Sequence, residues 1–167
     1  MEIYETYGMT ETITHIAAKR IGDEAFTVLP NVKVSVDDRD CLIIKAKKIS
    51  NKAIVTNDIV ELLSDTQFIW EGRYDNVINS GGVKLIPEQI EEKLASSISN
   101  CFFVYGQADE LLGEKLVLYV EGELMPIDES IFEALDKYEK PKEIFFIPEF
   151  KRTATGKVIR DQSIANR

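Results

Sequence analysis

The fold is decided by the stretch Gly72-Arg73-Tyr74-Asp75-Asn76-Val77-Ile78-Asn79-Ser80-Gly81-Gly82-Val83-Lys84-Leu85-Ile86-Pro87-Glu88-Gln89-Ile90-Glu91. It places a charged turn, a short apolar pair, a polar Ser-Gly-Gly loop and the start of an amphipathic helix next to one another. Glycines let the backbone approach a ligand closely, and a fixed Arg-x-Asp turn can hold or swing a domain. A segment that only packs rarely needs so many specialised residues, so we expect this stretch to be functional.

Downstream of this stretch the pattern predicts an α+β domain. Pro87 suits the first turn of a helix, where its missing N–H is no loss. Apolar residues then recur at every fourth position from Ile86 to Ile98, as on one face of a helix. A second helix is expected over residues 127–138. Strands are expected over residues 101–105, 116–120 and 144–147. The second of these strands is continuously apolar and is therefore expected to be central.

Upstream of the stretch the sequence is mostly β. Val32, Val34 and Val36 alternate with polar residues, as in a half-buried strand. Short strands at regular spacing predict a small antiparallel β-barrel-like subdomain or a sandwich, followed by the α+β half. Further strands are expected over residues 42–44, 53–56, 59–63 and 67–71. We therefore place the domain boundary near residue 75, between residues 1–74 and 75–167.

The composition narrows the classes of function. The 167 residues carry a formal net charge of −9 and one short basic run at residues 45–48, so nucleic acid is not expected as the main partner. Cys41 and Cys101 lie among apolar residues and are expected to be buried free thiols. With a single histidine and no cysteine pair, a zinc site is not expected. No apolar run is long enough to span a bilayer, and we expect a cytoplasmic protein.

Three polar segments interrupt the core pattern. They are Tyr7-Gly8-Met9-Thr10-Glu11-Thr12, then Asn57-Asp58 together with residues 72–84, and finally Thr153-Ala154-Thr155-Gly156-Lys157. Each segment alone also fits a structural role, since Thr10 and Thr12 could cap a helix. Asp58 and Arg73 could likewise form a surface ion pair, which contributes little stability.

Together and in this order, the three segments resemble the C-terminal part of the adenylate-forming enzymes. This superfamily contains acyl-CoA synthetases, peptide-synthetase adenylation domains and luciferases. The resemblance runs from Tyr7 to Lys157 and implies a mobile C-terminal α+β domain. It also implies that ATP activates a small-molecule carboxylic acid as an acyl-adenylate, which a thiol, usually that of CoA, then attacks to release AMP. A carboxylate attacks an anionic phosphate poorly, so such a site must neutralise both groups and hold them in line.

The resemblance implies that the first polar segment binds the nucleotide. Tyr7 would stack on adenine, and Gly8 would belong to the same binding segment. The Thr10 hydroxyl would hydrogen-bond the α-phosphate during catalysis. Glu11 would help to hold Mg²⁺, a hard cation that prefers oxygen ligands.

The other two segments complete the implied nucleotide site. Asp58 would accept hydrogen bonds from the ribose hydroxyls, and Arg73 would contact the same ribose. Lys157 would bridge the substrate carboxylate and the α-phosphate, a role that suits a compact charge on a flexible stem. The family usually has Thr-Gly-Asp where this chain has Thr56-Asn57-Asp58; the aspartate is kept, and a side chain replaces the glycine.

The stretch that begins at Gly72 carries the implied conformational change. Asp75 falls at the family's hinge, where the small domain rotates between the adenylation and thiol-transfer arrangements; a few junction residues absorb such a motion. After rotation, Gly81 and Gly82 would line the pantetheine tunnel of CoA. Lys84 fits a role in that step and also fits a solvated lysine beside a turn.

One element of the family is absent from the sequence. No Ser/Thr/Gly-rich phosphate loop with a lysine occurs in the 167 residues, although this element holds the β- and γ-phosphates of ATP in the family. We therefore expect this chain to be a fragment that does not catalyse adenylation by itself.

The compact form of the chain looks most like the o-succinylbenzoate–CoA ligases of menaquinone biosynthesis. The segments that carry this likeness include His15-Ile16-Ala17, Thr56-Asn57-Asp58 and residues 75–84. Three alternatives remain open: a ligase for fatty or aryl acids, a peptide-synthetase adenylation domain, and a non-catalytic module that binds nucleotide or regulates a partner. A structural histidine is the favoured interpretation of His15.

Overall fold

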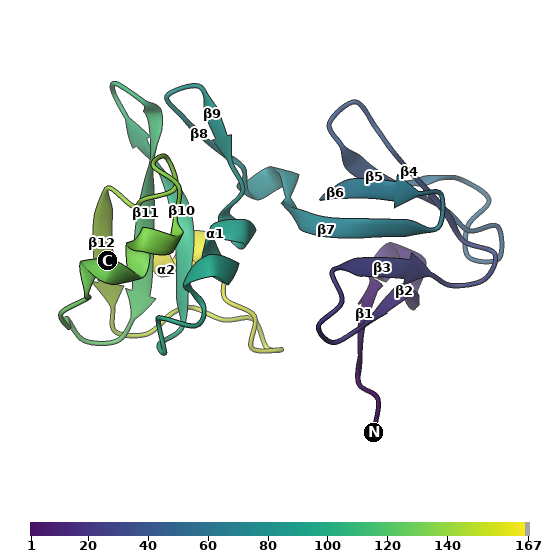
Figure 1. Cartoon of the computed structure of the whole chain (residues 1–167), viewed down its shortest axis with the longest axis horizontal. Coiled ribbons are helices and arrows are strands. Elements are labelled where there is room, and N and C mark those ends of the chain that lie inside the picture. Colours follow the sequence, from purple (N-terminus) through teal and green to yellow (C-terminus); the bar gives the residue numbers. More distant parts are fainter. Residues whose placement is uncertain (166–167) are drawn as a thin grey trace. The chain divides into compact units, whose positions relative to one another are not determined.

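The computed structural model describes residues 1–165, which divide into two compact units. The first unit comprises Met1–Asp75, and the second begins at Asn76 (Figure 1). Both units are built mainly from antiparallel β-sheet, with few helices. None of the helices within residues 1–165 is long and apolar enough to cross a membrane.

The first unit is a seven-stranded antiparallel sheet. In spatial order its strands are β1 (Tyr4–Gly8), β2 (His15–Arg20), β3 (Ala25–Val28), β7 (Gln67–Arg73), β6 (Ile54–Ser64), β5 (Cys41–Lys45) and β4 (Lys33–Val36). The expected hairpin of β4 and β5 is confirmed, with Val34 opposite Ile44. The two short strands expected over residues 53–56 and 59–63 form one strand, β6, whose register shifts after Ile59. A bulge of this kind lets a long strand bend.

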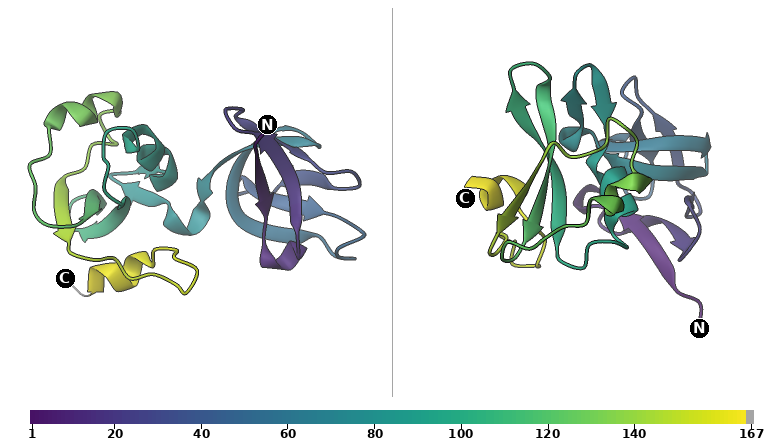
Figure 2. Two further views of the ribbon diagram at one scale, coloured as in Figure 1. Left: turned by 90° about the horizontal axis from the view of Figure 1, so that it is seen from below. Right: turned by 60° about the vertical axis from the view of Figure 1, so that its left-hand side comes forward.

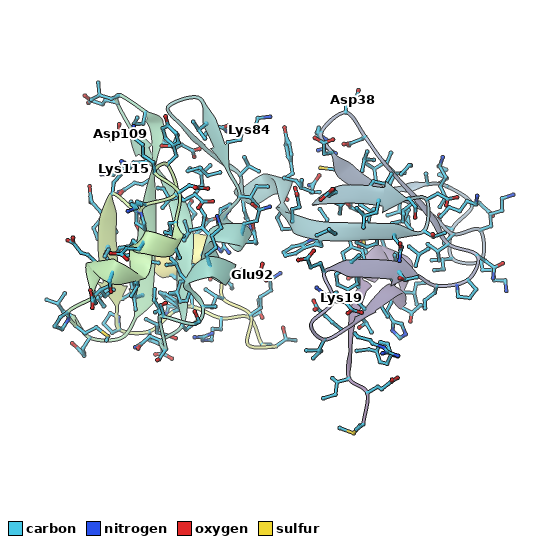
Figure 3. The ribbon with its side chains drawn as sticks, in the orientation of Figure 1. Lys19, Asp38, Lys84, Glu92, Asp109 and Lys115 are labelled. Carbon is cyan, nitrogen blue, oxygen red and sulfur yellow. The ribbon has the colours of Figure 1, made fainter. Side chains whose placement is uncertain are left out.

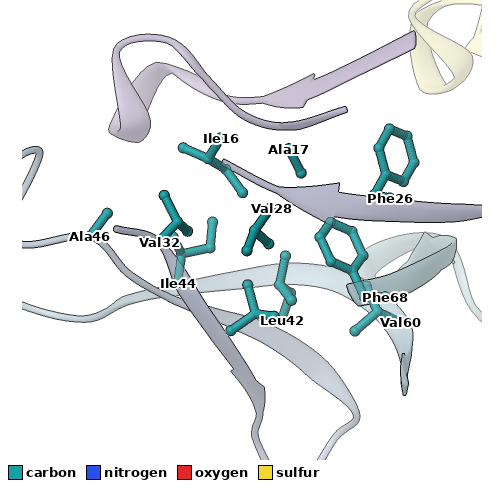
Figure 4. Packing of buried hydrophobic residues seen from close by; sticks show 11 residues of the cluster. Ile16, Ala17, Phe26, Val28, Val32, Leu42, Ile44, Ala46, Val60 and Phe68 are labelled. Atoms are coloured by element: carbon teal, nitrogen blue, oxygen red, sulfur yellow. The ribbon is translucent and has the colours of Figure 1, made fainter. Parts of the chain in front are cut away.

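The expected barrel-like closure of this unit is not confirmed. Among the described strands, β1 and β4 end the pairing order and each pairs with a single neighbour. Strands β2 to β7 nevertheless contribute to one core, so the sheet curls over its own inner face (Figure 4). Short strands at regular spacing suit a curled open sheet as well as a barrel, because closure depends only on whether the edge strands pair. The core residues are Ile16, Ala17, Phe26, Val28, Val32, Val34, Leu42, Ile44, Ala46, Val60 and Phe68.

The second unit is a five-stranded sheet with short helices. Its strands are β8 (Ile78–Ser80), β9 (Val83–Leu85), β10 (Phe102–Asp109), β11 (Gly113–Glu121) and β12 (Glu143–Ile147). The prediction that the apolar strand is central is confirmed, because β11 pairs with β8, β10 and β12. Helix α1 (Pro87–Leu94) begins at the expected proline and buries Ile90 and Leu94, but it ends before Ile98.

The prediction of a second α-helix over residues 127–138 is wrong. The segment forms a 3₁₀-helix, η3 (Glu129–Ala134), whose first turn is capped by Asp128 through the backbone N–H of Ser130. The turn buries Phe132, whereas Tyr138 is 57% exposed, so a longer helix would bury little further apolar surface. The remaining helix is α2 (Arg160–Ala165), which packs on a separate core with β10, β11 and β12 (Figure 2).

The two cysteines differ in environment. Cys41 is buried, as expected, at the start of β5. Cys101 is exposed just before β10, so the expectation of two buried thiols is wrong for that residue. The apolar residues after Cys101 misled the prediction, because the strand that they form begins one residue later.

Candidate functional site

A buried carboxylate organises the polar site of the first unit. Asp58 lies on β6, is only 6% exposed, and is held from two other strands. The hydroxyl of Tyr7 on β1 donates to Oδ2 of Asp58 at 2.5 Å. The indole Nε1–H of Trp70 on β7 donates to Oδ1 at 3.3 Å. The guanidinium Nε of Arg73 lies 3.7 Å from the same Oδ1, so a positive charge lies beside the hydrogen-bonded carboxylate.

The structure therefore brings together Tyr7, Asp58 and Arg73, three residues that the sequence assigned to the nucleotide site. The sequence analysis missed Trp70. The register of the hairpin of β6 and β7 could have revealed this residue. It sets Asp58 opposite Arg73 and Val60 opposite Trp70, so Trp70 lies close to Asp58. An indole N–H in such a place needs an acceptor, and the nearest carboxylate is two residues along the facing strand.

Tyr7 is held as a neutral donor. Its ring packs against Phe68 and Phe26, with ring centres 5.3 and 5.9 Å away. Burial raises the pKa of the Tyr7 hydroxyl far above its ordinary value, and the hydrogen bond to Asp58 raises it further. A protonated phenol can donate to Asp58 at any physiological pH, so loss of the Tyr7 proton does not break this contact in that range.

The first polar segment forms a tight turn whose tip is exposed. Residues Thr10–Thr12 form a 3₁₀-helix, in which the buried Thr12 hydroxyl accepts from the backbone N–H of Met9 at 3.0 Å. The Thr12 side chain thus caps the backbone of Met9, the N-cap residue, whereas the side chains of Thr10 and Glu11 are exposed. A Cβ added to Gly8 would lie 2.7 Å from the His15 Cα, so only glycine fits there.

This turn borders an open hollow. The hollow has a volume of about 400 Å³ and is lined by Thr6, Gly8, Met9, Thr10, Ile13, Thr14 and His15. His15 is exposed at its edge, so the favoured structural interpretation of this histidine gains no support. Among residues 1–165 no group of three or more histidine, cysteine or acidic side chains is placed to hold a metal ion. An exposed carboxylate such as Glu11 still fits Mg²⁺, which typically takes one or two protein carboxylates together with phosphate oxygens and water.

The expected hinge residue is fixed by its neighbours. Both oxygens of the Asp75 carboxylate accept from the Asn57 amide nitrogen, at 3.1 and 3.2 Å, and Oδ2 also accepts from Arg73 Nη2 at 2.9 Å. The bond from Arg73 lowers the pKa of Asp75, and the bond from Asn57 lowers it further. Arg73 therefore contacts both the site aspartate and the expected hinge aspartate.

The other expected site residues lie in the second unit. Gly81 and Gly82 form the exposed tip of the β8–β9 hairpin, with positive φ angles of 57° and 84°. This left-handed backbone is one that glycine adopts without strain. Lys84 points outward from β9 (Figure 3). The hairpin is pinned where Glu114 accepts from the backbone N–H of Asn79 at 2.7 Å.

Lys157 lies on a loop that is closed by hydrogen bonds. The backbone N–H of Thr153 donates to the carbonyl of Lys157 at 2.8 Å, and the Lys157 N–H returns a bond to the Thr153 hydroxyl at 3.1 Å. The Lys157 side chain is exposed, and within the described residues it forms no ion pair. Arg152 ties one end of the loop to Glu121.

Arg160 ties the other end of the loop to helix α1. Its guanidinium donates to Glu91 Oε2 at 3.0 Å and to the carbonyl of Val104 at 3.3 Å. Glu91 Oε1 accepts from the backbone N–H of Val104 at 2.8 Å. Burial raises the pKa of Glu91 to about 7, and the attraction of Arg160 opposes this rise.

Comparison with known proteins finds relatives and structural neighbours of one kind. No model of a protein family matches the chain. Relatives of the chain include 2-succinylbenzoate–CoA ligases and other acyl-CoA ligases, and its structural neighbours include adenylate-forming enzymes, whose C-terminal portion it matches. The solved o-succinylbenzoate CoA synthetase (MenE) from Bacillus subtilis, in complex with ATP and magnesium ion, aligns with a TM-score of 0.83 at 19% identity, covering 98% of this chain and 41% of that one.

Several of the relatives that align along nearly the whole chain are 2-succinylbenzoate–CoA ligases. The ligase of Lactococcus lactis is 28% identical over 186 residues, covering 97% of this chain and 41% of the relative. Indoleacetate–CoA ligase of Aromatoleum aromaticum is 35% identical over 106 residues, covering 56% of this chain and 20% of the relative. An acyl-CoA synthetase-like protein from Dyadobacter fermentans is 37% identical, with a TM-score of 0.54, and covers 99% of this chain and 51% of its own. The chain spans about two fifths of the length of the curated 2-succinylbenzoate–CoA ligases that it matches.

Proposed function

We propose that this chain carries part of the active site of an ATP-dependent acid–thiol ligase. The enzyme that contains it activates a carboxylic acid as an acyl-adenylate, releases pyrophosphate, and passes the acyl group to CoA with release of AMP. The acid that we propose is o-succinylbenzoate, because relatives of that name align along nearly the whole chain. We assign residues 1–74 to the end of the large nucleotide-binding domain and residues 75–167 to the small mobile domain.

The single observation that carries this proposal is the buried Asp58 carboxylate. Each of its oxygens receives one hydrogen bond, from Tyr7 or from Trp70, although a carboxylate oxygen can accept two. One lone pair on each oxygen is thus left for the two hydroxyls of a ribose. Arg73, 46% exposed, lies beside the carboxylate and can donate to the same sugar. A sugar diol matches this arrangement of two acceptors and one adjacent donor.

The remaining residues divide the reaction between two steps. In adenylation, Tyr7 stacks on the adenine, Thr10 donates to the α-phosphate, and Lys157 neutralises the substrate carboxylate and the α-phosphate together. Glu11 would hold Mg²⁺, which when bound offsets the charge of the phosphates. The exposed side chains of Thr10, Glu11 and Lys157 are free to take these roles.

In thiol transfer, the backbone of the hairpin tip approaches the pantetheine arm of CoA. Gly81 and Gly82 are exposed and have no Cβ, so an extended ligand can pass close to their main chain. Lys84 on the same hairpin can attract the phosphates of CoA. The change between the two steps is a rotation at Asp75.

Calorimetry with AMP tests the nucleotide half of the proposal on this polypeptide. We expect measurable binding, and we expect Asp58→Ala to abolish it. Asp65→Ala is the matched control, because Asp65 is an exposed residue of the same unit that pairs with Lys33. Absence of AMP binding, or equal binding by the Asp58→Ala and Asp65→Ala variants, would contradict the ribose assignment.

Turnover by the ligase that contains this chain tests the acid. We expect formation of AMP and an acyl-CoA from o-succinylbenzoate, CoA and ATP. One relative acts, by its name, on indoleacetate, so an aryl acid is the second candidate. Activity on aryl acids without activity on o-succinylbenzoate would replace the first candidate by the second. Absence of any acid-dependent AMP formation would instead favour a module that binds nucleotide without catalysis.

A further inference from the structure

Asn57 stands where the resembled family usually has glycine, and its side chain makes contacts that glycine cannot make. Its amide nitrogen donates to both carboxylate oxygens of Asp75, at 3.1 and 3.2 Å. These bonds connect β6 with the 3₁₀ turn η2 (Tyr74–Asn76). The expected hinge residue is therefore bound through its side chain to the strand that carries the ribose-binding aspartate.

The Asn57 amide is itself oriented by Arg39. Nη1 of Arg39, in the β4–β5 turn, donates to Asn57 Oδ1 at 3.2 Å, which leaves the amide nitrogen facing Asp75. Asp37 in turn fixes Arg39, accepting from Nε at 3.0 Å and from Nη2 at 2.7 Å. The guanidinium carbon also lies 5.0 Å from the centre of the Tyr74 ring, a distance typical of a cation–π contact.

These contacts restrain one short segment from two sides. Arg39 contacts Tyr74, and Asn57 contacts Asp75, so two successive residues of η2 are held by side chains of the sheet. Arg73 adds a third contact to Asp75. A segment whose φ and ψ angles must change in a hinge motion has to break side-chain contacts that depend on its conformation.

We propose that Asn57, oriented by Arg39, is a positioning residue that latches the Asp75 hinge. This inference rests on the proposed ligase function and deepens it. The latch stabilises the observed conformation of η2 and slows departure from it. An enzyme with glycine at this position lacks the latch, so this chain controls the balance between adenylation and thiol transfer through a side chain outside the reacting centre.

Trypsin tests the latch on the polypeptide itself, because the Arg73–Tyr74 bond lies at the edge of the latched segment. Native-state cleavage there follows the population of locally opened molecules when opening is fast. We expect Asn57→Ala to raise the cleavage rate at this bond about tenfold, the effect of losing a hydrogen bond to a charged group. Asn51→Ala, at an exposed asparagine of the same unit, is the control and should leave the rate unchanged.

A second readout separates a hinge role from a merely structural one. In the ligase that contains this chain, we expect Asn57→Ala to change the ratio of the single-turnover rates of adenylate formation and thiol transfer by at least threefold, whereas Asn51→Ala should not. Unchanged cleavage at Arg73–Tyr74 in the Asn57→Ala variant would overturn the latch. Faster cleavage with an unchanged ratio of the two rates would overturn its role in catalysis. If the wild-type enzyme forms no acyl-adenylate, the proposed ligase function fails, and the cleavage rates still decide whether the latch exists.

Discussion

Removal of one hydroxyl group tests whether the carboxylate network holds the first unit together. Tyr7→Phe deletes the donor that lies 2.5 Å from Asp58 Oδ2 and keeps the ring that packs on Phe26 and Phe68. Asp58 is 6% exposed, so water cannot fully replace the lost bond. Hydrogen bonds to charged groups contribute about 1.5–3 kcal/mol, and we expect a loss of about 2 kcal/mol in the free energy of unfolding.

The sole tryptophan makes the assay specific to this unit. Trp70 donates to the same carboxylate, so its fluorescence follows the unfolding of the site in urea. With an m-value of about 1–2 kcal/mol per M, the expected loss lowers the urea midpoint by about 1–2 M. Tyr4→Phe is the matched control on the same strand, because the Tyr4 hydroxyl donates to the exposed Glu2. An ordinary surface substitution changes the free energy of unfolding by about 0.5 kcal/mol or less. If the losses for Tyr7→Phe and Tyr4→Phe differ by less than about that amount, the reasoning is refuted.

The raised pKa of Tyr7 adds a pH dependence to the same experiment. The unfolded tyrosine loses its proton at about pH 10, whereas the folded tyrosine keeps it to higher pH. The folded state therefore binds more protons above pH 10, and its stability falls as pH rises. We expect the wild type to lose more stability than Tyr7→Phe between pH 9 and 11.

Three further variants test other parts of the molecule. The pKa of Glu91 is raised to about 7 in the folded state, so the second unit should lose about 3 kcal/mol of stability as pH rises from 4.5 to 7. Amide exchange in β10 measures this loss. Glu91→Gln should remove most of the pH dependence. Gly8→Ala should lower the free energy of unfolding by about 1–3 kcal/mol in urea, because its Cβ would lie 2.7 Å from the His15 backbone; an unchanged value would contradict that crowding. In the ligase that contains this chain, Lys157→Ala should slow adenylate formation at least 100-fold, which is within the range for electrostatic groups in active sites. The rate of acyl transfer from preformed adenylate to CoA should stay within about threefold of the wild-type rate. Lys151→Ala is the control and should change neither rate.

Elements that depend on local pattern were predictable from the sequence. The alternation of Val32, Val34 and Val36 predicts β4 and its hairpin, because side chains of a strand alternate between two faces. Pro87 predicts where α1 begins, and the continuous apolar run of β11 predicts its central place in the sheet. The motif around Arg73 and Asp75 likewise carries the resemblance to adenylate-forming enzymes in residues close together in the chain.

Features that depend on distant residues were decided only by the tertiary structure. Whether the first sheet closes depends on pairing between β1 and β4, which no local pattern records. The segment after Asp128 has a helical spacing of apolar residues, yet a 3₁₀ turn and the residue after it already bury Phe132 and Leu135.

The site shows the same division most clearly. The sequence by itself predicts which residues form the proposed nucleotide site, Tyr7, Asp58 and Arg73, and shows the asparagine at position 57 that departs from the pattern of the resembled family. It does not show that the Tyr7 hydroxyl reaches a carboxylate 51 residues away, that Trp70 completes this contact, or that Asn57 holds Asp75. These contacts arise because the sheet curls and brings β1, β6 and β7 together, and that curvature is a property of all the packed strands rather than of any one segment.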